Sequence, residues 1–271
     1  MSQAKLKRQS HAAILREARG CIYCAGVGAA SEIDHMPPRL MFRTTQRPKG
    51  LEFPSCSACN RRTSRLDVVA AYMTRTFPGI ANQVDEAEWG RLMGEVERVA
   101  PGLLREMYIP AYLQGPLLAE YGIPDPGASA VLRANGPLVS AHMQAFAAKV
   151  GFALHFEFTG TVVPIGGRVQ VRWFTSEEML NSRVPQSLYS SVGKPRIMRQ
   201  GRITSADLFE YGYGIYEQRA DIKLFFARLR QSIEIAAFVV EDPTKLPFPE
   251  GVLATFAPGD LQGVPVDRIT D

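Results

Sequence analysis

The arrangement of the four cysteines constrains this chain more than any other feature. Cys21, Cys24, Cys56 and Cys59 form two C-x-x-C pairs separated by 31 residues, and the 212 residues after them contain no cysteine. Two such pairs match a tetrahedral Cys₄ zinc site, whereas redox chemistry would need only one pair. Two disulfides would suit a small secreted scaffold, and this chain is neither small nor visibly secreted. The zinc site would be structural, because four thiolates leave no position open for water or substrate.

The positive charge of the chain is concentrated around the cysteines. The sequence has 31 basic and 27 acidic residues, and residues 1–65 hold 12 and 4 of them, so that segment carries +8 and the remainder −4. A basic segment on an acidic body suggests a polyanionic partner, nucleic acid first. A solvated lysine and arginine surface explains the charge equally well, so charge alone does not decide.

The interval between the cysteine pairs predicts a compact metal-supported unit. Short strands are expected at 31–34 and 51–54, with a double proline after the first and a basic loop between them. A helix is expected to open at Asn60 and to run to about Thr76. A core this thin would take much of its folding free energy from bound zinc.

The series C-x-x-C, D-H-x-P-P and C-x-x-C-N resembles the HNH endonucleases, whose catalytic unit is a ββα-metal finger in a zinc-bound treble clef. The resemblance covers about residues 20–65. It implies a metal-dependent endonuclease, a hydrolase of phosphodiester bonds, with DNA as the first expected substrate. HNH proteins commonly carry another asparagine before the second cysteine pair, and residues 36–55 contain none. A catalytically inactive, zinc-stabilised nucleic-acid-binding protein is therefore the alternative, and a zinc knuckle for protein contacts is a third reading.

The residue types also suit phosphodiester hydrolysis in their own right. The Asp34 carboxylate and the Asn60 amide offer hard oxygen ligands for Mg²⁺ or Mn²⁺, which would act as a Lewis acid and stabilise the leaving oxygen. His35 follows Asp34 on the expected strand, so it would point to the other side and act as general base on water. The structural alternatives are a turn cap for Asp34 and a helix N-cap for Asn60.

Basic side chains around this unit are candidates for phosphate contacts. Some lie in the loop between the expected strands, and others lie near the start of the helix, where free N–H groups already attract phosphate. Simple exposure to solvent is the alternative for all of them. The candidates are Arg39, Arg43, Arg47 and Lys49 in the loop and Arg61, Arg62 and Arg65 on the helix.

The expected fold class is α+β, with an N-terminal treble-clef HNH module followed by helices and a mostly antiparallel sheet of about five strands. The role of the second domain is open between substrate recognition, regulation and contacts in a homo-oligomer. The expected boundaries are 1–79 for the module and 80–271 for the second domain, with helices at 80–150, strands at 151–241 and an extended tail at 242–271.

Several strands are expected in the second domain. A Pro-Ile-Gly-Gly sequence between two apolar stretches is typical of a hairpin. Thr175 and Glu178 have the spacing of a capping box at the start of a short helix. The expected strands are 152–163, 168–174, 208–217, 223–230 and 232–240.

The sequence gives no sign of a membrane partner. Its longest apolar run, at about 235–240, has only the length of a strand. The basic start lacks the apolar core of a signal peptide. With 46% hydrophobic and 21% charged residues, the composition is that of an ordinary globular protein, and a cytoplasmic location is expected.

Overall fold

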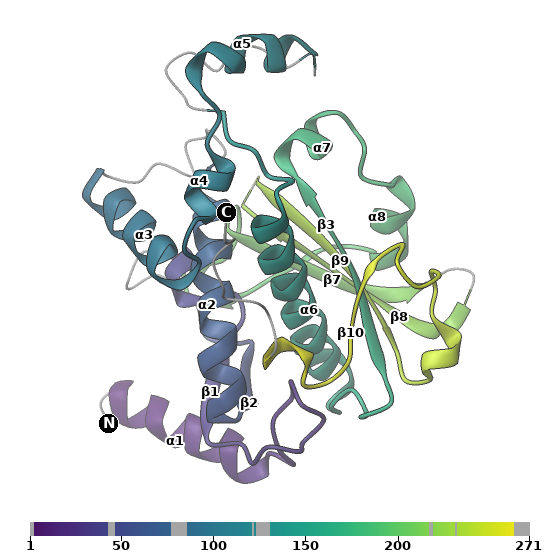
Figure 1. Ribbon diagram of the computed structural model, residues 1–271. Helices are drawn as coiled ribbons and strands as arrows, with labels where there is room; N and C mark the ends of the chain where they lie inside the picture. Colours follow the sequence, from purple (N-terminus) through teal and green to yellow (C-terminus); the bar gives the residue numbers. More distant parts are fainter. Residues whose placement is uncertain are drawn as a thin grey trace.

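The computed structural model has the expected α+β class. An N-terminal unit of helices and a short hairpin lies on one side of a long central helix, and a six-stranded sheet lies on the other side (Figure 1). The structure describes residues 3–42, 47–76, 86–120, 122, 131–216, 219–230 and 232–262. In this part of the chain, no helix combines the length and the apolar character that crossing a membrane requires.

The N-terminal unit has the predicted order of strand, loop, strand and helix. β1 (Glu32–His35) and β2 (Glu52–Ser55) pair antiparallel, within one residue of the expected strands. The following helix, α2 (Ser57–Met73), begins earlier than predicted because Cys56, and not Asn60, is its N-cap. A preceding helix, α1 (Gln3–Glu17), contacts both strands of the hairpin.

The central helix, α6 (Pro137–Thr159), packs against α2 on one side and against the sheet on the other. The predicted strand at 152–163 is wrong, because residues 152–159 continue α6 until Gly160 ends it with a φ of 70°. This helix is apolar on nearly every face, so it lacks the polar stripe that reveals a surface helix. At Gly151 the helix approaches the sheet so closely that a Cβ would lie 2.8 Å from the Val169 and Ala237 side chains.

The main sheet is antiparallel throughout, and the C-terminal segment adds one of its edge strands. The strand order is β10-β3-β9-β8-β7-β4, and β10 comes from the stretch that we expected to be an extended tail. The predicted hairpin at residues 164–167 is wrong, because this turn joins α6 to β3. The strands are β3 (Arg168–Thr175), β4 (Arg196–Ile197), β7 (Phe209–Tyr216), β8 (Arg219–Leu229), β9 (Ile233–Val240) and β10 (Ala254–Phe256).

Smaller elements surround these layers. The predicted capping box at Thr175 and Glu178 is confirmed at the start of α7. The helices expected within 80–150 are present in the described part of that stretch. The remaining elements are α3 (Glu86–Val99), α4 (Leu103–Met107), α5 (Ala111–Glu120), α7 (Ser176–Leu180), α8 (Gln186–Val192), and a short strand pair of β5 (Arg199–Gln200) and β6 (Ile203–Thr204).

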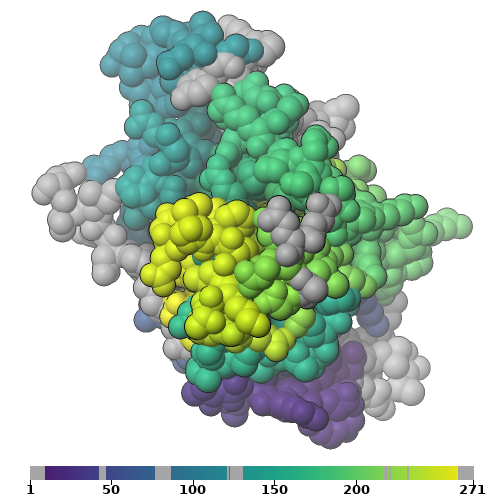
Figure 2. Space-filling view, turned by 90° about the vertical axis from the view of Figure 1, so that its right-hand side faces the viewer, coloured from purple at the N-terminus to yellow at the C-terminus, as the bar shows by residue number. Residues whose placement is uncertain are grey.

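One hydrophobic core joins the N-terminal unit to the sheet. It runs without interruption from Cys21 through α2 and α6 to the inner face of the sheet and Leu261. The chain end returns to the N-terminal unit, where the Gly259 N–H donates to the Tyr23 carbonyl oxygen at 2.8 Å. In the space-filling view the C-terminal segment lies against neighbouring parts of the sheet (Figure 2). The expected domain boundary at 79/80 lies outside the described residues.

Candidate metal centre and its ion-pair network

The two C-x-x-C pairs come together as a buried cluster. The sulfur atoms of Cys21, Cys24, Cys56 and Cys59 lie within 4.8 Å of one another and could hold a metal ion such as zinc. One pair lies in the turn before β1, and the other lies at the start of α2, so a shared ion would fasten the hairpin to the helix. No disulfide is formed among them.

Hydrogen bonds to the cluster favour thiolate sulfur, which is the form that binds metal, whereas burial opposes it. Backbone N–H groups donate to three of the sulfurs, from Tyr23 to Cys21 at 3.4 Å, from Gly28 to Cys24 at 3.2 Å and from Cys59 to Cys56 at 3.5 Å. A hydrogen bond with Cys59 lowers the pKa of Cys21 to about 5, whereas burial raises the pKa of Cys24 to about 11. A bound metal cation would displace the protons from those cysteine thiols that are still protonated.

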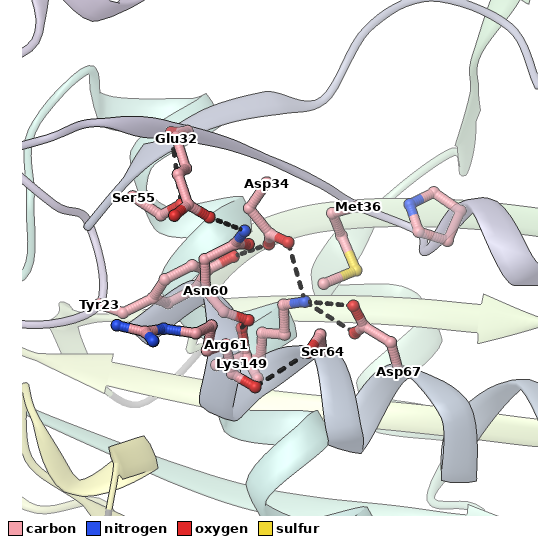
Figure 3. A network of polar contacts seen from close by, with 12 residues as sticks. Tyr23, Glu32, Asp34, Met36, Ser55, Asn60, Arg61, Ser64, Asp67 and Lys149 are labelled. Carbon is pink, nitrogen blue, oxygen red and sulfur yellow. Dashed lines mark hydrogen bonds and ion pairs between the residues drawn. The ribbon is translucent and has the colours of Figure 1, made fainter. Parts of the chain in front are cut away.

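Asp34 faces the interior, where its carboxylate is fully engaged. Tyr23 donates its hydroxyl proton to Oδ2, and the Lys149 ammonium from α6 lies 3.1 Å from Oδ1 (Figure 3). The same ammonium donates to both oxygens of Asp67 on α2, at 2.7 and 2.9 Å. The Lys149 side chain is 0% exposed and Asp34 is 5% exposed, so this network of Tyr23, Asp34, Asp67 and Lys149 is buried, with 12% of the Asp67 side chain reaching solvent.

The network has one positive charge for two acids, and the pKa shifts reflect this imbalance. Burial raises the pKa of Asp67 to about 7, even though Lys149 opposes that shift. Burial disfavours the Lys149 ammonium, but Asp34 and Asp67 outweigh it and raise its pKa. Burial, together with Asp34, also raises the pKa of the Tyr23 hydroxyl. The ammonium therefore stays charged, and Asp67 keeps its proton to a higher pH than an exposed aspartate does.

Asn60 faces the same side of β1 as Asp34 but is bonded elsewhere. Its amide nitrogen donates to the Glu32 carboxylate, and Glu32 and Asp34 share one face because they are two residues apart on a strand (Figure 3). Asp34 and Asn60, the predicted ligands of a catalytic cation, thus lie in one unit and on one face. Each of them is bonded to a protein partner.

His35 points away from this network, as the alternation along a strand predicts. It lies directly across from Glu52 on β2, and its Nε2 atom is 3.6 Å from Glu52 Oε1. The Arg39 guanidinium lies 2.6 Å from the same Nε2 atom. The three residues proposed for catalysis are therefore divided between the two faces of the hairpin, with Asp34 and Asn60 on one and His35 on the other.

The basic residues that were predicted to contact phosphate differ in their exposure to solvent. Four are exposed, and Arg65 is half-buried. Arg47 is internal: its guanidinium donates to backbone carbonyls between Met36 and Leu51, and burial lowers its pKa to about 10. It braces the loop. Arg43 lies outside the described residues, and the exposed candidates are Arg39, Lys49, Arg61 and Arg62.

Sequence reasoning missed Tyr23, Asp67 and Lys149. Lys149 had a recognisable signal, because it is a single charge inside a long apolar stretch, and a fully buried lysine needs a charged partner. Asp67 has the same signal between Leu66 and Val68. The sequence around Lys149 and Asp67 does not show that these two side chains contact each other, or that Lys149 contacts Asp34.

Comparisons of the chain with protein-family models, with curated proteins and with solved structures gave no match. The function of the site therefore has to be inferred from its own residues.

Proposed function

We propose that this chain is a zinc-stabilised nucleic-acid-binding protein in which the Asp34 carboxylate contacts a lysine ammonium in place of a catalytic divalent cation. The observation that carries the proposal is the 3.1 Å contact between Lys149 Nζ and Asp34 Oδ1 at a fully buried position. A catalytic Mg²⁺ keeps several waters and reaches substrate phosphate. A buried carboxylate that is already paired with an ammonium leaves room neither for those waters nor for substrate phosphate.

The cysteine cluster supplies the zinc-binding part of this proposal. Four cysteine sulfurs are a donor set that prefers zinc, and their close approach to one another suits a closed tetrahedral site. Its role is to hold the hairpin at the start of α2. Such a site stabilises the fold and performs no chemistry on a substrate.

Exposed basic residues supply the nucleic-acid surface. Arg61 and Arg62 lie in the first turns of α2, and Arg39 and Lys49 lie on the loop between β1 and β2. The segment that contains them has 12 basic and 4 acidic residues. Contacts of this kind bind phosphate through charge and carry little sequence information.

The binding half of the proposal is tested with fluorescently labelled duplex and single-stranded DNA and RNA at several salt concentrations. The apparent affinity is expected to fall steeply with salt, with a logarithmic slope of about −0.9 per phosphate contact on duplex DNA. The double variant R61A/R62A should bind more weakly and with a shallower slope. The matched control R172A/R183A removes two exposed arginines from the β3–α7 region and should bind as the wild type does. Equal binding by all three proteins would overturn the proposed surface.

The absence of catalysis is tested separately by a plasmid-nicking assay with Mg²⁺ or Mn²⁺. We expect wild type and H35A to give the same background. Cleavage by the wild type that H35A loses would overturn the non-catalytic half of the proposal while leaving the binding result intact.

An HNH endonuclease acting on DNA is the second candidate, with His35 as general base and Asp34 and Asn60 as ligands of Mg²⁺ or Mn²⁺. One observation favours it: Asp34 and Asn60 face the same side of β1, and His35 faces the other, as the proposed roles require. Under this candidate Lys149 must leave Asp34 before the cation enters. K149A, assayed under conditions where circular dichroism shows it to be folded, should then increase metal-dependent nicking, whereas the first candidate expects no nicking from the folded K149A protein.

A further inference from the structure

A second cluster of metal-ligating side chains lies on the opposite face of the hairpin from the Asp34 network. His11 comes from α1, His35 from the end of β1 and Glu52 from the start of β2. Their ligand atoms all lie within 4.8 Å of one another. His11 Nε2 is 3.3 Å from Glu52 Oε2, and His35 Nε2 is 3.6 Å from Glu52 Oε1.

We propose that His11, His35 and Glu52 form a binding site for a divalent transition-metal ion, separate from the cysteine cluster. Two imidazoles and a carboxylate suit Zn²⁺, Co²⁺ or Ni²⁺ and leave coordination positions open for water or another ligand. Metal bonds of about 2.0–2.2 Å place neighbouring donor atoms about 3–3.5 Å apart. The two measured separations, 3.3 and 3.6 Å, are close to that spacing.

The fold fixes the three residues from independent directions. The register of the hairpin places His35 directly opposite Glu52, on the face away from Asp34. α1 contacts both strands and brings the His11 ring edge-on to His35, with ring centroids 5.9 Å apart. The backbone therefore brings the three side chains together before any ion binds.

One polar atom in this cluster also lies beside a carboxylate without forming a hydrogen bond to it. His11 Nε2 is buried and makes no hydrogen bond within the described part of the chain, although it faces the Glu52 carboxylate. A buried ring nitrogen without a hydrogen bond is unfavourable. A metal ion would take up this nitrogen and the carboxylate together.

Two arginines lie close to the proposed site, and they would respond differently to a bound metal ion. The Arg39 guanidinium lies 2.6 Å from His35 Nε2, where the ion would approach, and it is exposed, so it is free to swing into solvent. Arg47 lies 3.9 Å from Glu52 Oε1 and is held by the loop carbonyls, so it would remain. Metal binding should therefore displace Arg39 and compete with it.

The test is a Co²⁺ titration of the full-length protein that carries a single equivalent of zinc, which occupies the cysteine cluster, followed by calorimetry and by visible absorption. The wild type is expected to bind one further equivalent of Co²⁺. That ion should give only the weak bands of nitrogen and oxygen ligation, because no thiolate-to-cobalt charge-transfer band arises at this site. H11Q and E52Q should weaken this binding at least about tenfold, since even the loss of an outer partner of a metal ligand has an effect of that size.

Matched variants separate ligation from general damage. E32Q changes a carboxylate on the same hairpin but on the opposite face, and it should bind Co²⁺ as the wild type does. R39Q should bind more tightly, because the competing guanidinium is gone. Circular dichroism checks that every variant is folded.

Three results would overturn the proposal: no further Co²⁺ equivalent in the wild type, undiminished affinity in H11Q or E52Q, or no gain in R39Q. The proposal does not depend on nucleic-acid binding, so the DNA and RNA titrations described above can fail while this site stands.

Discussion

Lys149 is a buried charged residue that connects separate elements in the interior of this protein. Its ammonium contacts Asp34 on β1 and Asp67 on α2 while belonging to α6, so one side chain connects three elements. A charge at a 0% exposed position is stable only when it is paired and hydrogen-bonded.

Replacing this ammonium by an apolar side chain should be strongly destabilising. K149M leaves two buried acids without their counter-ion, and we expect the free energy of unfolding to fall by about 3–5 kcal/mol near neutral pH. Denaturation with urea measures the change. K194M, at an exposed lysine, is the control and should stay within about 0.5 kcal/mol of the wild type. A loss below about 1 kcal/mol in K149M would contradict the ion-pair network.

The same network predicts a pH dependence of stability. The pKa of Asp67 is raised from 3.8 to about 7, so between these values the folded protein holds a proton that the unfolded chain has released. The resulting stabilisation is fully present below about pH 4 and is lost as the pH rises through about 7, with a slope of up to about 1.4 kcal/mol per pH unit. D67N removes the group, so its unfolding free energy should fall less over this range. If the unfolding free energies of the wild type and D67N fell equally over this pH range, the raised pKa of Asp67 would be contradicted.

At the residue scale, sequence reasoning succeeded where the relevant geometry is local. The alternation along a strand predicts that Asp34 and His35 point to opposite faces, and the C-x-x-C spacing predicts that the four cysteines meet. Sequence reasoning failed where two interacting residues are far apart along the chain. Lys149 lies 115 positions from Asp34, and no local pattern places the two in contact. Arg47 was proposed for phosphate contacts because its charge is visible in the sequence and its bonds to loop carbonyls are not.

At the scale of elements, helix α6 shows the limit of periodicity. Phe152, Leu154 and Phe156 alternate with other residues as they would on a strand, and a helix buried on all sides has no polar stripe to contradict that pattern. The strands β3, β7 and β9 were predicted to within one residue at each end, because turn residues bound them and they are rich in apolar residues, whereas β8 begins four residues before its predicted start.

The start of α6 depends on a carboxylate from another helix. Glu106 on α4 accepts hydrogen bonds from the backbone N–H groups of Leu138 and Val139, both at 2.9 Å. The N-cap position is Gly136, where a Cβ would lie only 2.2 Å from the Glu106 carboxylate, so a capping side chain there is excluded. The negative charge also lies at the positive end of the helix dipole.

Removing this carboxylate should weaken the fold. E106A is expected to lower the free energy of unfolding by about 1–2 kcal/mol, which is the effect of losing a helix cap together with a favourable charge. Urea denaturation is again the measurement. E120A, at an exposed position at the end of α5, should change little. If the two variants were equally stable, Glu106 would have no capping role.

At the scale of the whole molecule, the continuous core predicts cooperative unfolding. The hydrophobic cluster connects Cys21 near the N-terminus with Leu261 near the C-terminus, passing through α2 and α6. A shared core of this kind favours a single transition for both parts of the chain.

Metal removal should therefore act on the entire fold. In a W89F background, Trp173 reports the sheet, and metal release from the cysteine cluster should coincide with its fluorescence change on heating. Addition of a chelator should lower the midpoint of that one transition, because the metal stabilises only the folded state. An early loss of metal that leaves the Trp173 signal unchanged would show that the two parts unfold independently.

Because Lys149 belongs to α6, the cysteine-bearing unit up to the end of α2 cannot be transferred to another protein without change. Asp34 and Asp67 both lie before the end of α2, whereas their counter-ion is supplied from α6, 115 positions beyond Asp34. A fragment cut after α2 would take both acids with it and leave the cation behind. Grafted onto another scaffold, such a cassette would carry uncompensated carboxylates on its newly uncovered side. A successful transplant would have to include α6 or neutralise the acids.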